Sequence, residues 1–226
     1  MGKFKGIIFD LDGTLVDTEI DFRQMKREMI KELEINGIVA NSLTPEMTTV
    51  VIQENAERVW AELNMPETER VRLRDEMTRL MDAAEMKAIH TLNVISGASE
   101  AVRMLYKTGY RLGILTRSNH AYALEAIRKM GVEKEFMTVL GRGDTSQPKP
   151  YAEAMIEAAK ALQLEVKEVL MVGDHNIDST CAVNGGCYFI GVATGPRGEK
   201  SWEQNRPEVI LRSVADLPTY LTEKYS

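Results

Sequence analysis

The chain has 226 residues, of which 44% are hydrophobic and 27% are charged, and its formal net charge is -6. This length suffices for one large α/β domain or for a core domain that carries a smaller one. The acidic balance offers no general attraction to nucleic acid or to an anionic membrane, so an anionic substrate requires a local cluster of positive groups.

The opening segment, MGKFKGIIFD, predicts a short buried strand over residues 6–9. Asp10 interrupts the apolar run, which is therefore too short for a secretory signal or a membrane span. Cys181 and Cys187 are too few for a disulfide framework and lack metal-ligand spacing. We interpret them as packing residues of a protein in a reducing cytoplasm.

Residues 18 to about 88 contain no convincing strand but carry three helical patterns, at roughly 18–35, 45–63 and 67–89. We predict a helical domain over residues 17–88, inserted into an α/β core formed by residues 1–16 and 89–226. Seven of the thirteen methionines fall in this segment: Met25, Met29, Met47, Met65, Met77, Met81 and Met86. They are expected to fill the core of a small bundle, with an adaptable binding surface as the alternative.

From about residue 92 onward, short apolar runs alternate with helical patterns, which is typical of a doubly wound parallel sheet. Strands are predicted at 111–115, 138–140, 169–172 and 188–192, with a weaker one at 209–211. Helices are predicted at roughly 98–108, 119–130, 151–163, 177–185 and 213–222, with Gly109, Gly131 and Gly186 as C-terminal stops.

Ligands of an open parallel sheet bind at the carboxyl ends of its strands, so the polar residues there are candidates for chemistry. Asp10 and Asp12 follow the first strand at i, i+2 spacing, which predicts two carboxylates on one side of the strand end. Such a pair is tolerable around a divalent cation such as Mg²⁺, and Asp174 from another strand end would complete the site. Gly13 allows close approach of the backbone to a phosphate, and Thr14 offers a hydroxyl donor.

Cationic and hydroxyl groups follow other strands of the predicted sheet. Thr116, Arg117 and Ser118 come directly after the strand at 111–115 and can donate to an anion. Lys149 stands between two prolines that stiffen its backbone, and Pro150 suits the first position of the next helix. Each residue alone is explained as a cap, a turn or a solvated charge, but the set on one sheet edge is not.

These residues resemble, in order, the four motifs of haloacid-dehalogenase-type phosphatases. FDLDGTLVD at 9–17 is similar to the first motif, Thr116 to the second, Lys149 to the third and the segment 173–178 to the fourth. The resemblance covers essentially the whole chain, because the inserted helices stand where that superfamily has a cap domain. The most similar subgroup is that of phosphoglycolate phosphatase and β-phosphoglucomutase relatives.

The resemblance implies an Mg²⁺-dependent phosphatase that acts on a small phosphorylated metabolite in the cytoplasm, with no nucleic-acid or membrane partner. Asp10 would be the nucleophile that forms an aspartyl-phosphate, and Asp12 would be the general acid and base. By the same resemblance, Mg²⁺ would be held by Asp10, the main-chain carbonyl of Asp12 and Asp174; Thr116 and Lys149 would bind the phosphoryl group, and Asp178 would orient Lys149.

Several alternatives stay open at this point. A phosphomutase keeps the same core residues and differs in the cap, and a phosphonatase would use a cap lysine. A dehalogenase needs no second acid, so Asp12 favours phosphoryl transfer. A receiver domain also combines Asp, Thr and Lys around Mg²⁺, but it lacks the Asp12-Gly13-Thr14 continuation and the inserted helices. The sequence does not decide whether the protein is a catalytically silent scaffold or which phosphate ester is its substrate. It also does not decide between a monomer and a homodimer.

Overall fold

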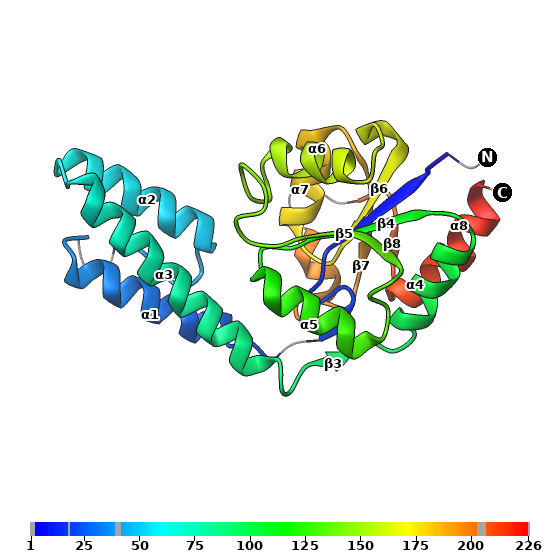
Figure 1. Cartoon of the computed structure of the whole chain (residues 1–226), viewed down its shortest axis with the longest axis horizontal. Coiled ribbons are helices and arrows are strands. Elements are labelled where there is room, and N and C mark those ends of the chain that lie inside the picture. Colours follow the sequence, from blue (N-terminus) through cyan, green and yellow to red (C-terminus); the bar gives the residue numbers. More distant parts are fainter. Residues whose placement is uncertain (1–2, 18, 39–41, 203–206, 226) are drawn as a thin grey trace. The chain divides into compact units, whose positions relative to one another are not determined.

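The structure is a computed structural model that describes residues 3–17, 19–38, 42–202 and 207–225 (Figure 1). The chain divides into two compact units, Met1–Thr18 with Thr91–Ser226, and Glu19–His90. The sequence analysis placed these boundaries two residues earlier, between 16 and 17 and between 88 and 89. The first unit is an α/β sandwich and the second is a bundle of helices, and each is described separately.

The first unit is built on a six-stranded sheet in the order β5-β4-β1-β6-β7-β8, in which every neighbouring pair is parallel. Its strands are β1 (Gly6–Phe9), β4 (Arg111–Leu115), β5 (Phe136–Leu140), β6 (Val169–Gly173), β7 (Tyr188–Val192) and β8 (Ile210–Leu211). The predicted strands and the doubly wound class are confirmed, although β5 begins two residues before the predicted start. The strand order reverses at β1, which places the topological switch point beside its carboxyl end.

Helices cover both faces of this sheet (Figure 1). On one face lie α4 (Ala98–Lys107), α5 (His120–Met130) and α8 (Leu217–Tyr225); on the other lie α6 (Ala152–Ala161) and α7 (Asn176–Gly185). The described part of this unit also contains three short 3-10 turns: η1 (Val166–Glu168), η2 (Gly198–Trp202) and η3 (Val214–Asp216). Ile8 and Met171 of the sheet pack with Met155, Ala158 and Cys181 in one buried cluster. Every residue of β1 and of β6 is buried, as the continuous apolar runs predict.

The helix boundaries follow from local chemistry. The side chain of Asn119 accepts hydrogen bonds from the first turn of α5, and the helix ends at Gly131 with φ of +66°. Gly186 ends α7 in the same left-handed conformation, as predicted. The prediction for Pro150 was wrong, because α6 begins two residues later at Ala152 with Tyr151 as its N-cap.

A small antiparallel ladder lies where the chain leaves and re-enters the first unit. It pairs β2 (Val16–Asp17) with β3 (Asn93–Val94). Neither strand was predicted, because two residues are too few to show a period of two in the sequence. The ladder therefore joins the segment that precedes the inserted helices to the segment that follows them.

The second unit consists of α1 (Phe22–Ile35), α2 (Thr49–Glu62) and α3 (Glu67–Ala88), close to the predicted helical ranges. Residue 18, where the first pattern was expected to start, lies outside the described residues. Six of the seven methionines are buried in or packed against the bundle core with Trp60 and Leu73, whereas Met86 is exposed. In the described ranges, no helix combines the length and the apolar character needed to cross a membrane.

The two methionines of α3 with opposite environments allow a matched test of the bundle core. Met77 is 1% exposed and Met86 is 41% exposed. We predict that Met77→Ala lowers the free energy of unfolding by about 2–5 kcal/mol, because it leaves a cavity. Met86→Ala should change it by less than about 0.5 kcal/mol. Urea denaturation followed by circular dichroism measures both, and equal losses would contradict the assigned core.

Candidate active site

Four polar segments meet at the carboxyl edge of the sheet. In the register of the sheet, Phe9 lies opposite Ile114 on β4 and Val172 on β6, so β1 ends within one residue of the ends of both neighbours. Asp10, Thr116 and Asp174 follow these strands directly and are all buried. The main-chain N–H of Asp10 donates to the carbonyl of Val172 at 2.8 Å, which extends the ladder into the site.

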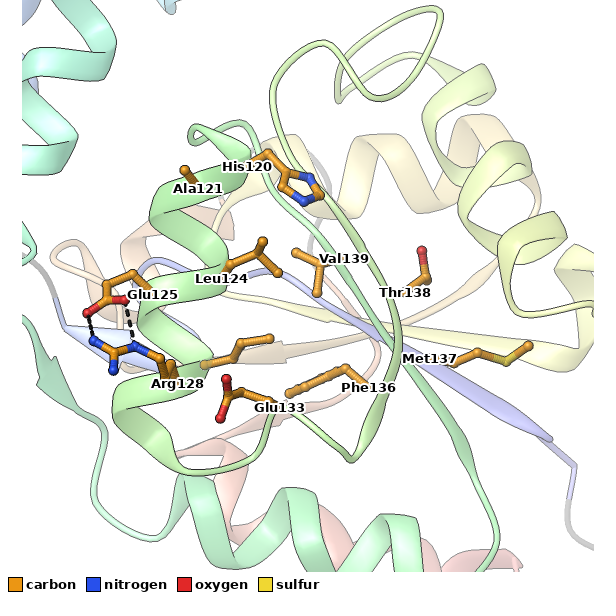
Figure 2. Close-up of a pocket in the computed structure, with 11 residues that line it drawn as sticks. His120, Ala121, Leu124, Glu125, Arg128, Glu133, Phe136, Met137, Thr138 and Val139 are labelled. Carbon is orange, nitrogen blue, oxygen red and sulfur yellow. Dashed lines mark hydrogen bonds and ion pairs between the residues drawn. The ribbon is translucent and has the colours of Figure 1, made fainter.

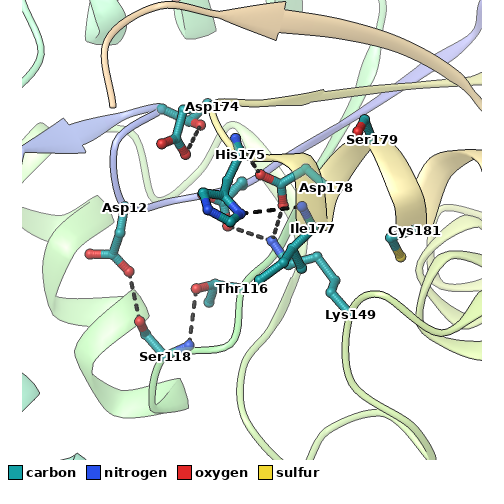
Figure 3. A network of polar contacts seen from close by, with 12 residues as sticks. Asp12, Thr116, Ser118, Lys149, Asp174, His175, Ile177, Asp178, Ser179 and Cys181 are labelled. Carbon is teal, nitrogen blue, oxygen red and sulfur yellow. Dashed lines mark hydrogen bonds and ion pairs between the residues drawn. The ribbon is translucent and has the colours of Figure 1, made fainter. Parts of the chain in front are cut away.

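A buried ion triad lies at the centre of this edge. Lys149 Nζ donates to Asp10 Oδ1 at 2.5 Å and to Asp178 Oδ1 at 2.7 Å. Lys149 and Asp178 are each 2% exposed, and Asp10 is 8% exposed. The other carboxylate oxygen of Asp178 accepts from the main-chain N–H of His175 at 3.1 Å. Asp178 is thereby fixed to its own helix start beside Lys149 (Figure 3), and it holds the ammonium group against Asp10.

The carboxylates of Asp10, Asp174 and Asp178 form one cluster, in which one ligand oxygen from each lies within 4.8 Å of the others. These donors are all oxygens, which is the set that a hard cation such as Mg²⁺ prefers. One lysine does not neutralise three carboxylates in a buried site. The residues present therefore fit a divalent cation.

The electrostatics of the cluster follow from burial. Burial raises the pKa of Asp10, against the attraction of Lys149, and the neighbouring charge of Asp178 raises it further. The pKa of Asp174 is raised by burial first and then by Asp10 and Asp178. Burial alone would lower the pKa of Lys149, but Asp10 and Asp178 raise it above its ordinary value. Added positive charge would therefore stabilise the ionised carboxylates.

Asp12 is not one of the three carboxylates of this cluster and has hydrogen-bond partners of its own. Its carboxylate accepts from the Ser118 hydroxyl at 2.6 Å and from the Tyr122 hydroxyl at 2.8 Å. The charge of Asp12 also raises the pKa of Asp10, so the two carboxylates lie within electrostatic range of each other. Burial raises the pKa of Asp12, against the hydrogen bonds from Ser118 and Tyr122.

The predicted phosphate-binding groups surround the two acidic sites. The Thr116 hydroxyl accepts from the main-chain N–H of Ser118 at 3.1 Å. Thr14 is fully buried, and its hydroxyl donates to Asp174 Oδ1 at 3.5 Å. The carbonyl of Arg117 accepts from Arg142 Nη1 at 3.2 Å, which fixes the backbone of this loop. The structure thus brings together Asp10, Asp12, Gly13, Thr14, Thr116, Ser118, Lys149, Asp174 and Asp178.

Two contributors were missed by the sequence analysis. Tyr122 lies on the buried face of α5, where it has the sequence pattern of an apolar core residue. That pattern gives no sign that its hydroxyl group binds Asp12. Thr194, after β7, donates its hydroxyl to the carbonyl of Gly13 at 2.6 Å. The rule that singled out the other strand ends would also have found Thr194, because it follows Val192 by two residues.

A separate groove of about 610 Å³ lies between α5 and the edge strand β5 (Figure 2). Leu124, Phe136 and Met137 line it, and the ion pair of Glu125 with Arg128 lies on its rim. None of the residues that meet at the carboxylate cluster lines this groove. It therefore does not belong to the candidate active site.

The glycine after Asp12 is required for packing as well as for conformation. Gly13 has φ of +84°, and a Cβ there would lie 2.7 Å from the carboxyl carbon of Asp174. Gly143 also has φ of +84°, but a Cβ there would meet no atom within 4 Å. The two glycines have the same φ, but only at Gly13 would an added Cβ meet a neighbouring side chain.

We predict that Gly13→Ala lowers the free energy of unfolding by about 1–3 kcal/mol more than Gly143→Ala, because only the first forces Asp174 to move. Chemical denaturation of both variants measures the difference. The same loss in both would show that Asp174 does not pack tightly on this turn.

Comparison with known proteins places the chain in a family. The family model of haloacid dehalogenase-like hydrolases matches residues 7–192. Over 217 residues the chain is 25% identical to pyrophosphatase PpaX of Listeria welshimeri, covering 96% of this chain and 95% of that protein. It is 24% identical over 239 residues to a phosphoglycolate phosphatase of Shigella dysenteriae, covering 96% and 93%.

Solved structures share the fold. A predicted phosphoglycolate phosphatase from Haemophilus somnus superposes with a TM-score of 0.66 at 20% identity, covering 97% of this chain and 99% of that one. A β-phosphoglucomutase from Clostridium difficile gives a TM-score of 0.67 at 17% identity, covering 98% and 96%. The family model spans most of the chain, and these structures share its architecture. The chain belongs to the haloacid dehalogenase-like hydrolase family.

Proposed function

We propose that this hydrolase is an Mg²⁺-dependent phosphatase that cleaves a small phosphate ester through an aspartyl-phosphate on Asp10. The observation that carries the proposal is the separation of two acidic functions at one sheet edge. Asp10 lies in the buried carboxylate cluster with Lys149, and Asp12 is held by Ser118 and Tyr122 outside it. A nucleophile and a proton donor need such different surroundings.

Asp10 is suited to attack phosphorus because its surroundings can keep it ionised. The ammonium of Lys149 contacts its carboxylate directly, and a bound cation would add to this effect. In the first step a carboxylate oxygen of Asp10 bonds to phosphorus, and the bond from phosphorus to the leaving oxygen breaks. Splitting hydrolysis in this way replaces one difficult step by two easier ones.

Asp12 is assigned the proton transfers of both steps. Its raised pKa favours the protonated form, which gives its proton to the leaving oxygen. The resulting carboxylate then takes a proton from water, whose oxygen attacks phosphorus and releases Asp10 and inorganic phosphate. The hydroxyls of Ser118 and Tyr122 keep the carboxyl group in place for both transfers.

The remaining groups hold the substrate and the cation. We assign the cation to side-chain oxygens of Asp10 and Asp174 and to the main-chain carbonyl of Asp12; when bound, Mg²⁺ would neutralise charge on the phosphoryl oxygens. Lys149 and Thr116 are assigned to the phosphoryl group, with support from Gly13, Thr14, Arg117 and Ser118. Asp178 orients Lys149 through the 2.7 Å contact. Positioning and charge neutralisation supply most of the catalysis of phosphoryl transfer.

Hydrolysis is favoured over phosphoryl transfer within a sugar phosphate. The named relatives that match nearly the full length of this chain are a pyrophosphatase and a phosphoglycolate phosphatase. The likeness to a β-phosphoglucomutase is a likeness of fold at 17% identity. Pyrophosphate hydrolysis is therefore the second candidate activity. The division into a core and an inserted helical unit fits a cap domain, which we assign to Glu19–His90.

A substrate screen tests the proposed activity. Wild-type protein should release phosphate from p-nitrophenyl phosphate, phosphoglycolate, sugar phosphates, nucleoside monophosphates or pyrophosphate when Mg²⁺ is present. Removal of divalent cations with EDTA should abolish release, and added Mg²⁺ should restore it. Release of phosphate that is indifferent to EDTA would contradict the metal assignment, and no release from any ester or from pyrophosphate would contradict the function.

Asp10→Asn should abolish turnover while the protein stays folded. The amide lacks a nucleophilic carboxylate, so we expect kcat to fall at least about a thousandfold. Asp216→Asn is the control, because Asp216 pairs with Arg212 beside α8 and outside the site. Steady-state kinetics and far-UV circular dichroism provide the two readouts. An Asp10→Asn variant with wild-type kcat would exclude Asp10 as nucleophile.

Asp12→Asn should separate the two chemical steps. We expect turnover of an alkyl phosphate to fall on the order of a hundredfold or more, since leaving-group protonation is lost. p-Nitrophenolate leaves without protonation, so this substrate should still phosphorylate Asp10 and give a burst of about one equivalent before slow turnover. Stopped-flow absorbance records the burst. Linear release at the wild-type rate would show that Asp12 performs neither proton transfer.

A further inference from the structure

The loop that follows β7, residues 193–198, contacts the candidate active site at two points. Thr194 donates its hydroxyl to the carbonyl of Gly13 at 2.6 Å. Gly195 packs against Asp174 so closely that a Cβ there would lie 1.8 Å from Asp174 Oδ2. Any side chain at Gly195 would therefore displace a carboxylate of the cluster. The loop is therefore part of the site, although it lies outside the four motif positions at 9–17, 116, 149 and 173–178.

Arg197 is presented by this loop. The main-chain N–H of Gly198 donates to the carbonyl of Gly195 at 2.9 Å, which closes a tight turn around Arg197. The side chain of Arg197 is exposed, whereas Asp10 and Lys149 are buried. The turn thus holds Arg197 two residues from Gly195, which packs on Asp174 of the buried cluster.

The charge of the site gives this arginine a role. Four carboxylates lie at this edge, and Lys149 is already bound to two of them. A divalent cation and one lysine would leave the carboxylates and an incoming phosphoryl dianion without full compensation. Among the described residues, Arg117, beside Thr116, and Arg197, on the loop after β7, are cations whose charges reach this edge.

Both arginines act on the residue next to Asp174. Burial lowers the pKa of His175, and the charges of Arg197 and Arg117 lower it further, against the attraction of Asp178. His175 lies among the labelled residues of the site (Figure 3). Along the backbone, Arg117 adjoins Thr116 and Arg197 lies two residues from Gly195, so both arginines belong to segments that contact the site.

We propose that Arg197, together with Arg117, binds the second anionic group of a substrate that carries two, so that the preferred substrates are bis-anionic phosphates. This inference rests on the proposed phosphatase function. The transferred phosphoryl group must reach the buried Asp10, whereas the exposed Arg197 is placed for the end that does not react. The second group is a phosphoryl, as in pyrophosphate, or a carboxylate, as in phosphoglycolate; guanidinium binds either in bidentate fashion.

Arg197→Gln tests the subsite by the ratio of activities. Relative to kcat/KM for p-nitrophenyl phosphate, which has no second anion, kcat/KM for pyrophosphate, phosphoglycolate or both should fall about tenfold. A loss for pyrophosphate alone identifies a phosphoryl as the second group, and a loss for phosphoglycolate alone identifies a carboxylate. Arg197→Lys should recover part of the ratio. Arg212→Gln is the matched control, because the side chain of Arg212 is 93% exposed and pairs with Asp216, between β8 and η3 and outside the site.

A binding measurement separates this inference from the proposed function. Calorimetry with Mg²⁺ should show that wild type binds methylenediphosphonate more tightly than methylphosphonate, and that Arg197→Gln loses this preference. A ratio unchanged by Arg197→Gln in both assays, or an equal loss with p-nitrophenyl phosphate, would overturn the subsite even if the phosphatase activity is present. Absence of all hydrolysis with the binding preference intact would instead contradict the phosphatase and leave the anion site standing.

Discussion

The contact of Lys149 with Asp10 and Asp178 is the interaction on which the site depends. An isolated charge in the interior is costly, and a buried ion pair is tolerated only when each partner is held by further hydrogen bonds. Asp178 meets this condition, since it also accepts from the main-chain N–H of His175. The lysine in turn makes it possible to bury Asp10 beside Asp174, where two carboxylates would otherwise repel each other.

The sheet topology explains why these residues meet. Asp10 follows β1, which lies between β4 and β6, and the strand order reverses at this point. Crossover connections of a parallel sheet return each chain segment to the same edge, so residues more than a hundred positions apart end as neighbours. The small residues Gly13 and Gly195 then let two loops close on Asp174. The residues at the strand ends thus determine the chemistry of the site. Packing of the two loops around the carboxylate of Asp174 fixes their positions.

The period and composition of the sequence were enough to predict the fold. Continuous apolar runs such as 169–172 predict strands buried on both faces, and glycines at 131 and 186 predict helix ends, because these signals are local. The meeting of Asp10 and Asp174 was also predictable, since a single topological rule collects strand ends on one edge, whereas Lys149 lies in the loop between β5 and α6 and was assigned by the resemblance to the family. The two-residue strands β2 and β3 carry too little pattern to be found.

The orientation of individual side chains could not be predicted in the same way. The hydrogen bonds that Asp12 accepts from Ser118 and Tyr122 were not predicted, because they join segments more than a hundred residues apart. Tyr122 gave no signal, because a buried helical tyrosine has the same pattern as any core residue. Such contacts depend on two segments whose relative placement is decided by tertiary packing.

The measurement that tests the central claim most directly is chemical trapping of the covalent intermediate. Enzyme mixed with a hydrolysable phosphate ester and Mg²⁺ is quenched in acid, reduced with borohydride and digested, and the peptide that contains residues 6–17 is analysed by mass spectrometry. The account predicts reduction of the Asp10 acyl-phosphate to homoserine at position 10 alone. Modification at another aspartate, or none in a wild-type enzyme that is turning over and shows a burst, would contradict it.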